Sequence, residues 1–283
     1  MAGLLSGLEK FGLHYLEEAG LYEQEKKEKE AEKPKAAPVA MKEEDYLYDK
    51  THECPVCYAT IKERTLKVAK AKLVRTDLDL RPVYDNFEPL KYDVIICPHC
   101  GFAALGRYFK GLMPFQIKAI RELISASYQP TNLKKSTYTY EEALERYKLS
   151  LANAIVKRAK ASEKAYICLK SGWLLRSMQE NMDGVGPDFE AKMTDLKKQE
   201  DEFLKNALEG FITAKQTENY PMCGMDEHTV DYIIAVLAMY NGQYDISSKL
   251  ISSILANTTV SHRMKEKTRD AKEELIARLK EKR

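Results

Sequence analysis

The chain carries two short cysteine motifs, Cys54-Pro55-Val56-Cys57 and Cys97-Pro98-His99-Cys100-Gly101-Phe102. In a Cys-x-x-Cys motif a tight turn brings both sulfurs to one metal ion, at about 2.3 Å for Zn²⁺. Two such motifs supply the four thiolates of a closed tetrahedral site. We therefore predict that Cys54, Cys57, Cys97 and Cys100 bind one structural Zn²⁺ per chain.

The residues next to these cysteines suit metal-binding turns. Pro55 and Pro98 follow the first cysteine of each motif, where a fixed φ helps to hold the turn. Gly101 follows the second motif, where a left-handed residue lets backbone amides point at the thiolates. Tyr58 takes the equivalent place after the first motif, so we expect a less ideal turn there.

The segment between the motifs has the length of a small β module. It spans 39 residues, from Tyr58 to Ile96. We predict a zinc-ribbon-like module over residues 46–112, with β character over 68–80 and a second strand over 92–96 that leads into Cys97. In the first strand one face would carry Val74, Thr76, Leu78 and Leu80, and the other Arg75, Asp77, Asp79 and Arg81.

Redox chemistry is the competing interpretation of these motifs, because Cys-Pro-His-Cys also occurs as the active pair of disulfide oxidoreductases. Such a site needs one motif at the start of a helix in a βαβ unit, whereas here two motifs are matched and Gly101 would break that helix. His99, and His52 two residues before Cys54, are either substitute ligands, hydrogen-bond donors to the site, or solvated turn residues.

Composition places the chain among soluble proteins with a hydrophobic core. The 283 residues are 44% hydrophobic and 31% charged, and 45 basic against 43 acidic residues give a net charge of +2. No segment has the length of a membrane span, and residues 232–240 are better explained as a helix buried on all sides. The N-terminus lacks the pattern of a signal peptide, so we expect a cytoplasmic protein whose six cysteines are ligands or core residues.

The N-terminal region divides into two predicted segments. Apolar residues recur at helical spacing over residues 1–22, which predicts a short amphipathic helix. Its polar face is slightly acidic, so we expect it to dock on a protein groove, either in its own chain or in a partner, rather than on a membrane. Residues 23–45 are rich in Glu, Lys, Ala and Pro, and we predict a charged flexible linker.

Residues 113–283 predict a helical domain. We expect helices over 114–128, 139–162, 173–178, 188–215, 226–241, 244–257 and 259–280, with a Thr139 and Glu142 capping box. Residues 234–255 resemble a tetratricopeptide repeat, with Gly242 at the turn and Ser247 where alanine is usual. We predict a tetratricopeptide-like helical array, which would leave a concave face for a partner. A plain bundle that only supports the module is the simpler alternative. The predicted fold class is thus mainly α with a small β zinc-ribbon-like module.

Several longer segments together resemble a known bacterial family. The segments are Gly7–Leu13, Cys54–Cys57, Lys72–Tyr84, Tyr92–Ala104 and Pro221–Glu227. They are similar to domain-of-unknown-function family 2225, and the resemblance covers most of the chain. It implies a cysteine module followed by tetratricopeptide-like helices, and it brings no known activity.

No catalytic motif was found in the sequence. It has no phosphate-binding glycine loop, no nucleophile elbow and no His-Glu-x-x-His helix, so we predict a protein that is not an enzyme. Cys168 and Cys223 are expected to be buried or loop thiols, with a lowered pKa as the alternative for Cys223. Asp77, Asp79, Arg81 and Tyr84 either line a binding surface or form an internal salt-bridge lattice that joins the module to the helices.

The function predicted from these features is that of a zinc-binding adaptor, which binds an unknown protein or peptide with its helical array. Nucleic-acid binding is the alternative, and thiol-redox chemistry a further one. The alternative rests on a local basic run and on aromatic residues for stacking: Lys62, Arg64, Lys67, Lys70, Lys72 and Arg75, with Tyr58, Phe87, Tyr92 and Phe102. Neighbouring acidic residues such as Asp85 and Glu88 weaken this basic field.

Overall fold

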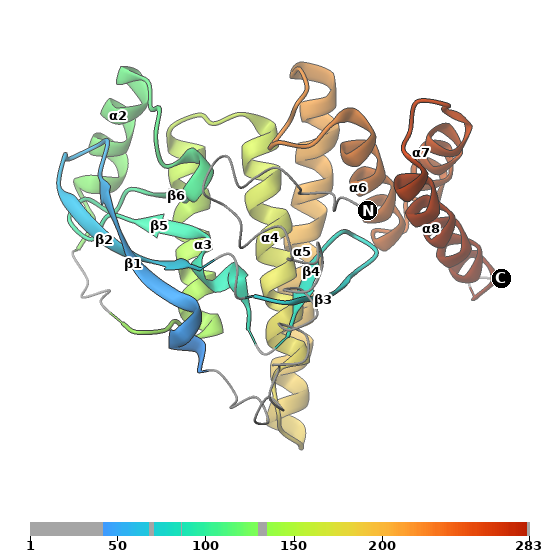
Figure 1. Cartoon of the computed structure of the whole chain (residues 1–283), viewed down its shortest axis with the longest axis horizontal. Helices are drawn as coiled ribbons and strands as arrows, with labels where there is room; N and C mark the ends of the chain where they lie inside the picture. Colours follow the sequence, from blue (N-terminus) through green and yellow to red (C-terminus); the bar gives the residue numbers. More distant parts are fainter. Residues whose placement is uncertain (1–41, 68–70, 86, 130–134, 282–283) are drawn as a thin grey trace, which may run out of the picture. The chain divides into compact units, whose positions relative to one another are not determined.

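The computed structural model describes residues 42–67, 71–85, 87–129 and 135–281. The predicted helix over residues 1–22 and most of the predicted linker over 23–45 lie outside the described residues. Residues from Glu43 onward cluster as one unit. Figure 1 shows this unit as small sheets followed by a series of helices.

Three two-stranded antiparallel sheets are found in the described ranges. Their strands are β1 (Leu47–Glu53) with β2 (Thr60–Leu66), β3 (Leu73–Thr76) with β4 (Pro82–Tyr84), and β5 (Val94–Ile96) with β6 (Ala103–Leu105). Short 3₁₀ segments η3 (Glu43–Tyr46), η4 (Pro89–Tyr92) and η5 (Gly106–Tyr108) flank them. The first cysteine motif joins β1 to β2, and the second joins β5 to β6. Each motif is therefore the tip of a hairpin.

Most of the described chain after the sheets is helical. The helices are α2 (Pro114–Ile120), which continues into the π-helical turn η6 (Arg121–Ser125), α3 (Tyr140–Val156), α4 (Ala161–Glu180), α5 (Pro187–Thr217), α6 (Glu227–Tyr240), α7 (Tyr244–Ala256) and α8 (His262–Glu281). The predicted capping box is confirmed, because the Thr139 side chain accepts from the Glu142 amide and the Glu142 carboxylate from the Thr139 amide. The predicted fold class, mainly α with small antiparallel sheets and a C-terminal helical array, is also confirmed.

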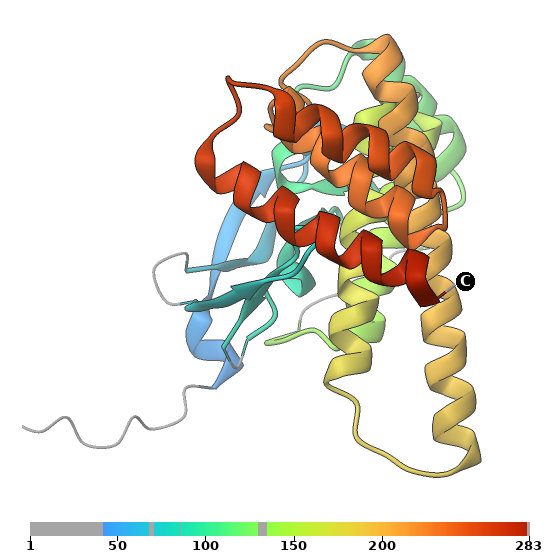
Figure 2. The same cartoon turned by 90° about the vertical axis from the view of Figure 1, so that its right-hand side faces the viewer.

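The main hydrophobic core lies between the sheets and the first helices of the array. Val94, Ile96, Ala103 and Leu105 of β5 and β6 pack in one cluster with buried residues of α3, α4, α5 and α6. Figure 2 shows the strands together on one side of the helices. In α6, residues 232–239 are each at most 2% exposed, which confirms the prediction of a helix buried on all sides up to residue 239. Tyr240, the last residue of the predicted segment, is half-buried.

The single strand predicted over residues 68–80 is wrong in its extent and in its faces. β3 ends at Thr76, and a turn follows in which the Leu80 amide donates to Asp77 O at 3.0 Å and Leu80 has a φ of +69°. Val74, expected on the apolar face, is 59% exposed, whereas Asp79 and Arg81 are fully buried. The alternation fails because the buried charges pair with α4, far along the chain.

The helix predicted over residues 139–162 is also interrupted. α3 ends at Val156, Arg158 has a φ of +53°, and α4 begins at Ala161. The buried Lys157 forms an ion pair with Glu163 across this break, with an Nζ to Oε1 distance of 2.7 Å. The turn lets α4 pack beside α3 instead of continuing its axis.

The predicted domain boundary between residues 112 and 113 stays a prediction. Strands on one side of this boundary share a hydrophobic core with helices on the other side. The tetratricopeptide-like character of α6 and α7 also stays a prediction. There Gly242 has a φ of +71° at the turn, and Ser247 is fully buried. Among the described residues, no helix combines the length and the apolar character that a membrane crossing needs.

Candidate metal centre

The four cysteines of the two motifs meet at one point. Their sulfur atoms all lie within 4.8 Å of one another. Across the two hairpins, Cys57 Sγ lies 3.5 Å from Cys97 Sγ, and Cys54 Sγ lies 3.6 Å from Cys100 Sγ. A tetrahedron with metal–sulfur bonds of about 2.3 Å has edges of about 3.8 Å. The thiols are thus spaced as ligands of one tetrahedral metal ion would be.

The backbone of each motif folds into the same turn, which we call a knuckle (residues 54–59 and 97–102). The Tyr58 amide donates to Cys54 O at 2.8 Å, and the Gly101 amide donates to Cys97 O at 3.0 Å. Tyr58 has a φ of +62° and Gly101 a φ of +72°. Both knuckles therefore need a left-handed residue directly after the second cysteine, as was predicted for Gly101.

The cysteine thiols are linked by hydrogen bonds, which lower the pKa of Cys97, whereas hydrogen bonds with neighbouring thiols and burial raise the pKa of Cys54 and Cys100. Hydrogen bonds from the thiols of Cys100 and Cys54, and then from the amides of His99 and Cys100, hold the pKa of Cys97 well below its ordinary value. Cys54, Cys97 and Cys100 are buried and Cys57 is half-buried. A set of four sulfur donors with amide partners suits a soft or borderline cation such as Zn²⁺.

Three residues outside the module donate side-chain hydrogen bonds to backbone carbonyl groups of the knuckles. Arg121 Nε donates to Val56 O at 3.0 Å, Ser125 Oγ to Cys100 O at 2.8 Å, and Asn153 Nδ2 to Gly101 O at 3.0 Å. Sequence reasoning missed these residues, because they lie between 25 and 65 positions from their partners and follow no motif.

The two histidines near the motifs lie outside the ligand cluster. His99 is exposed at the tip of the second knuckle. The His52 ring contacts the Phe109 ring edge to face, with centroids 5.7 Å apart, and burial lowers its pKa, with smaller contributions from Lys50 and Lys110. The group of potential ligands found in the described residues contains the four cysteines alone.

The remaining cysteines are not activated thiols. Cys168 is buried in α4, and its burial raises the pKa to about 12. Cys223 Sγ donates to Ser162 O at 3.2 Å, and burial raises its pKa as well. The alternative of a lowered pKa at Cys223 is therefore wrong, because desolvation outweighs the hydrogen bonds around the sulfur.

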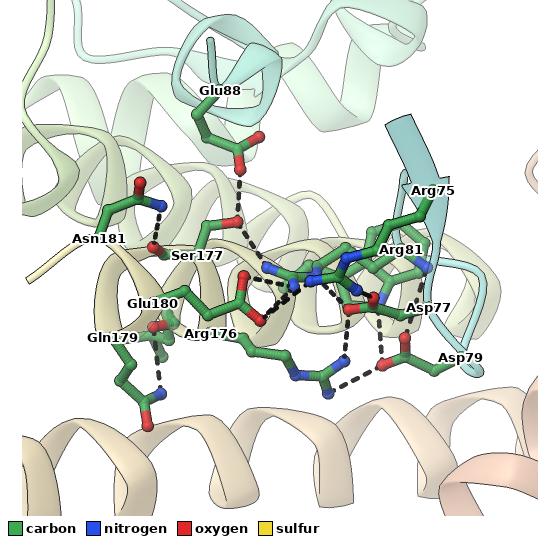
Figure 3. Close-up of polar contacts among 12 residues, drawn as sticks. Arg75, Asp77, Asp79, Arg81, Glu88, Arg176, Ser177, Gln179, Glu180 and Asn181 are labelled. Carbon is green, nitrogen blue, oxygen red and sulfur yellow. Dashed lines mark hydrogen bonds and ion pairs between the residues drawn. The ribbon is translucent and has the colours of Figure 1, made fainter. Parts of the chain in front are cut away.

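The charged residues of the β3–β4 hairpin form an internal lattice with α4 (Figure 3). Arg81 Nε donates to Asp77 Oδ2 at 2.6 Å, and Arg81 Nη2 contacts Glu180 Oε1 at 2.6 Å. Asp79 Oδ2 accepts from Trp173 Nε1 at 3.1 Å and lies 2.9 Å from Arg176 Nη2. The lattice interpretation is thus confirmed for these residues.

Tyr84 differs from the rest of this group. It is half-buried, it lines a cavity of about 330 Å³ with Glu88 and Tyr140, and burial raises its pKa. Since Asp79 and Arg81 are fully buried, they offer no side chain to a partner.

Most of the aromatic residues considered for nucleic-acid binding are buried, whereas Lys62, Lys72 and Arg75 are exposed. Phe87, Tyr92 and Phe102 are buried, and of the four aromatic residues Tyr58 alone is exposed, at 64%. In the basic run Arg64 forms an ion pair with Asp49 at 3.2 Å, and Arg75 one with Asp77. Lys70 lies outside the described residues.

Comparison with known protein families identifies a match over most of the chain. The family described as "Uncharacterized protein conserved in bacteria (DUF2225)" matches residues 47–275, which include both knuckles and nearly all of the helices. No curated protein and no solved structure matches the chain.

Proposed function

The chain belongs to the bacterial DUF2225 family, and we propose that it is a non-enzymatic zinc protein whose helical array binds a partner protein. The metal has a structural role in this proposal, and the residues after the module carry the recognition. We place the protein in the cytoplasm, where thiols stay reduced and available to a metal.

We propose zinc because the four donors are all sulfur atoms and because they fill every coordination position of a tetrahedral ion. Four thiolates complete a tetrahedral shell and leave no open position for substrate or water, which is the usual arrangement of structural zinc. Cys54, Cys57, Cys97 and Cys100 would hold the ion. Bound there, it would supply folding free energy by joining the two hairpins, whose residues Val56, Ile61 and Ile95 also share a hydrophobic cluster.

A groove between three helices carries the proposal of a partner. α3, α4 and α5 lie side by side in that order (Figure 1), and a cavity of about 630 Å³ is lined by all three. Its apolar lining includes Leu151, Ile155, Ala165 and Phe203. Ile155 is 60% exposed. An apolar groove between helices is a common receptor for the apolar face of another helix.

The charges along this groove suggest the chemistry of the occupant. Lys148 and Lys164 lie on the side of α3 and α4, whereas Glu202 and Glu209 lie on α5. We propose that the occupant is an amphipathic helix of a partner protein, with acidic residues along the edge that faces α3 and α4 and basic residues along the edge that faces α5. Residues 1–22 would provide a second contact with the partner.

A capture experiment tests the partner. The full chain, a variant lacking residues 1–22 and the Ile155→Asp variant are used as baits, and captured proteins are identified by mass spectrometry. Ile276→Asp is the matched control, since Ile276 is a 42% exposed apolar residue of α8. A synthetic helix from the captured protein is then titrated against each bait. Binding that Ile155→Asp weakens about tenfold or more and Ile276→Asp leaves unchanged supports the proposal, because a buried carboxylate disrupts an apolar contact. Equal binding to both variants contradicts it.

Metal content tests the other half of the proposal. One zinc per chain in purified protein is expected. Protein without zinc in which Cys54 or Cys97 readily forms a disulfide would favour the thiol-redox alternative. Oligonucleotide binding that weakens steeply with salt would favour the nucleic-acid alternative.

A further inference from the structure

A second cavity, separate from the helical groove, lies where the module meets α4. Its volume is about 370 Å³, within the range of about 300–1,000 Å³ that is common for small-molecule sites. Residues of β1, β2, η4, β5, β6, η5 and α4 contribute to its lining. Neither the metal centre nor the proposed partner groove uses these residues.

The charge of this cavity is positive. Lys50, Arg107 and Lys170 line it, and Asp93 is the single carboxylate among the lining residues. That carboxylate is already engaged, because it forms an ion pair with Lys170. Within the part of the chain that the structure describes, no carboxylate forms an ion pair with Lys50 or Arg107. The three cations exceed the single carboxylate by two.

Two of the cations are held in place by an aromatic ring. Arg107 Cζ lies 5.4 Å and Lys170 Nζ 5.1 Å from the centre of the Tyr166 ring. The Lys170 side chain is only 15% exposed, and the Asp93 charge raises its pKa against the effect of burial. Lys170 therefore keeps its charge inside the protein. The Arg107 guanidinium also donates to Cys223 O, which helps to fix its position.

One polar atom of the cavity lining lacks a partner. His52 Nε2 is buried and makes no hydrogen bond. Lys50 and His52 lie on the same face of β1, two residues apart. An anion that bound between Lys50, Arg107 and Lys170 would bring an acceptor oxygen to this side of the cavity, where the ring nitrogen can donate to it.

We propose that this cavity binds the phosphate monoester group of a small molecule. A phosphate monoester carries close to two negative charges at neutral pH, which matches the excess of two cations. A phosphodiester carries only one. Charge-assisted hydrogen bonds from Lys and Arg to phosphate oxygens are short and strong, and the half-buried cavity would increase their strength relative to water.

Titration with two simple probes tests this proposal on the full, metal-loaded chain. Methyl phosphate represents the monoester and dimethyl phosphate the diester, and both are added at constant ionic strength while backbone amide signals are followed by NMR. Methyl phosphate should shift the signals of residues around Lys50, Arg107 and Lys170 with a saturable curve. Dimethyl phosphate should bind at least about tenfold more weakly, because it has half the charge.

Two exposed lysines on the same hairpin give a matched pair of variants. Lys50 lines the cavity, while Lys62 alternates with the buried Ile61 and Glu63 and so points to the other face of β2. Lys50→Gln should weaken methyl phosphate binding about tenfold, since it removes a charged hydrogen bond. Lys62→Gln should leave the affinity unchanged.

Three outcomes would overturn the proposal. They are the absence of saturable shifts with methyl phosphate, equal affinity for the two probes, and equal weakening by Lys50→Gln and Lys62→Gln. Arg107→Gln serves as a second cavity variant. Circular dichroism spectra that match those of the unaltered chain establish that each variant is folded. Since the measurement uses neither a protein partner nor the helical groove, its failure is distinct from failure of the proposed function.

Discussion

The two knuckles have the same turn and very different surroundings. Around the second, Cys97 and Phe102 are fully buried, and side chains from η6 and α3 bind the carbonyls of Cys100 and Gly101. Around the first, Tyr58 is 64% exposed, and its ring lies 5.8 Å from Arg121 Cζ. Cys54 and Val56 of the first knuckle are fully buried as well. The contrast therefore lies in the residue after each second cysteine, which is packed against Tyr128 in the second knuckle and faces solvent in the first.

This difference explains why one knuckle has glycine and the other tyrosine at the same left-handed position. A Cβ at Gly101 would lie 2.5 Å from Cγ and Cδ2 of Tyr128, so packing excludes any side chain there. Tyr58 faces solvent and needs only to tolerate its backbone conformation, which costs about 1–2 kcal/mol for a residue with a Cβ. The same turn therefore needs glycine only where it is buried.

The largest effect is expected from loss of a ligand in the buried knuckle. Cys97→Ser should remove zinc binding and unfold the module, because binding free energies of structural zinc reach about 10 kcal/mol or more. Cys57→Ser should retain part of the zinc, since Cys57 is half-buried and water can replace its sulfur. Elemental analysis and chemical denaturation measure both. Equal zinc loss in the two variants would contradict the expected difference between the buried ligand Cys97 and the half-buried ligand Cys57.

Gly101→Ala should be the next most damaging change. It combines a left-handed alanine with a clash against Tyr128, and we expect a loss of about 2–4 kcal/mol in the free energy of unfolding. The double variant Gly101→Ala with Tyr128→Ala should recover the part that is due to the clash. Urea denaturation of the single and double variants separates the two contributions, and no recovery would mean that packing is not the reason for the glycine.

The anchors of the two knuckles should differ in importance. Asn153 is fully buried, so Asn153→Ala leaves Gly101 O without its donor and should cost about 1–3 kcal/mol. Arg121→Ala should cost less than about 1 kcal/mol, because Arg121 is exposed and water can take its place at Val56 O. The free energies of unfolding of both variants test this order. A larger loss for Arg121→Ala would reverse it.

The smallest effect is expected at the exposed left-handed residue. Tyr58→Gly removes the backbone strain and also the contact with Arg121, and it adds flexibility to the unfolded chain. We expect a change between zero and about 1 kcal/mol in favour of the folded state. Thermal denaturation at fixed zinc concentration measures it. A loss of more than 1 kcal/mol would show that the Tyr58 side chain is needed at the site.

Local sequence rules predicted the site well because its chemistry is local. The spacing within Cys54–Cys57 and Cys97–Cys100 sets the turn, and Gly101 marks its end. The caps at Thr139 and Asp226 likewise depend on neighbours three residues away, so the beginnings of α3 and α6 were predicted correctly.

The errors occurred where distant residues decide the conformation. Asp79 and Arg81 look like solvent-facing residues of a strand, but Trp173 and Ser177, more than 90 positions away, bind them in the interior. Arg158 adopts a left-handed conformation just after the end of α3. The sequence has no glycine or proline at this position that would have predicted the end of the helix. Such features depend on tertiary pairing, and a local pattern carries no signal for them.

The shared core of β5, β6 and the helices has a consequence for how the protein can be dissected. A fragment that ended at residue 112 would keep all four cysteines and would expose Val94, Ile96, Ala103 and Leu105, which are at most 2% exposed in the whole chain. We expect that fragment to aggregate even when zinc is supplied. A bound metal can join the two hairpins, but it cannot bury the apolar face of β5 and β6. That face is covered by the helices.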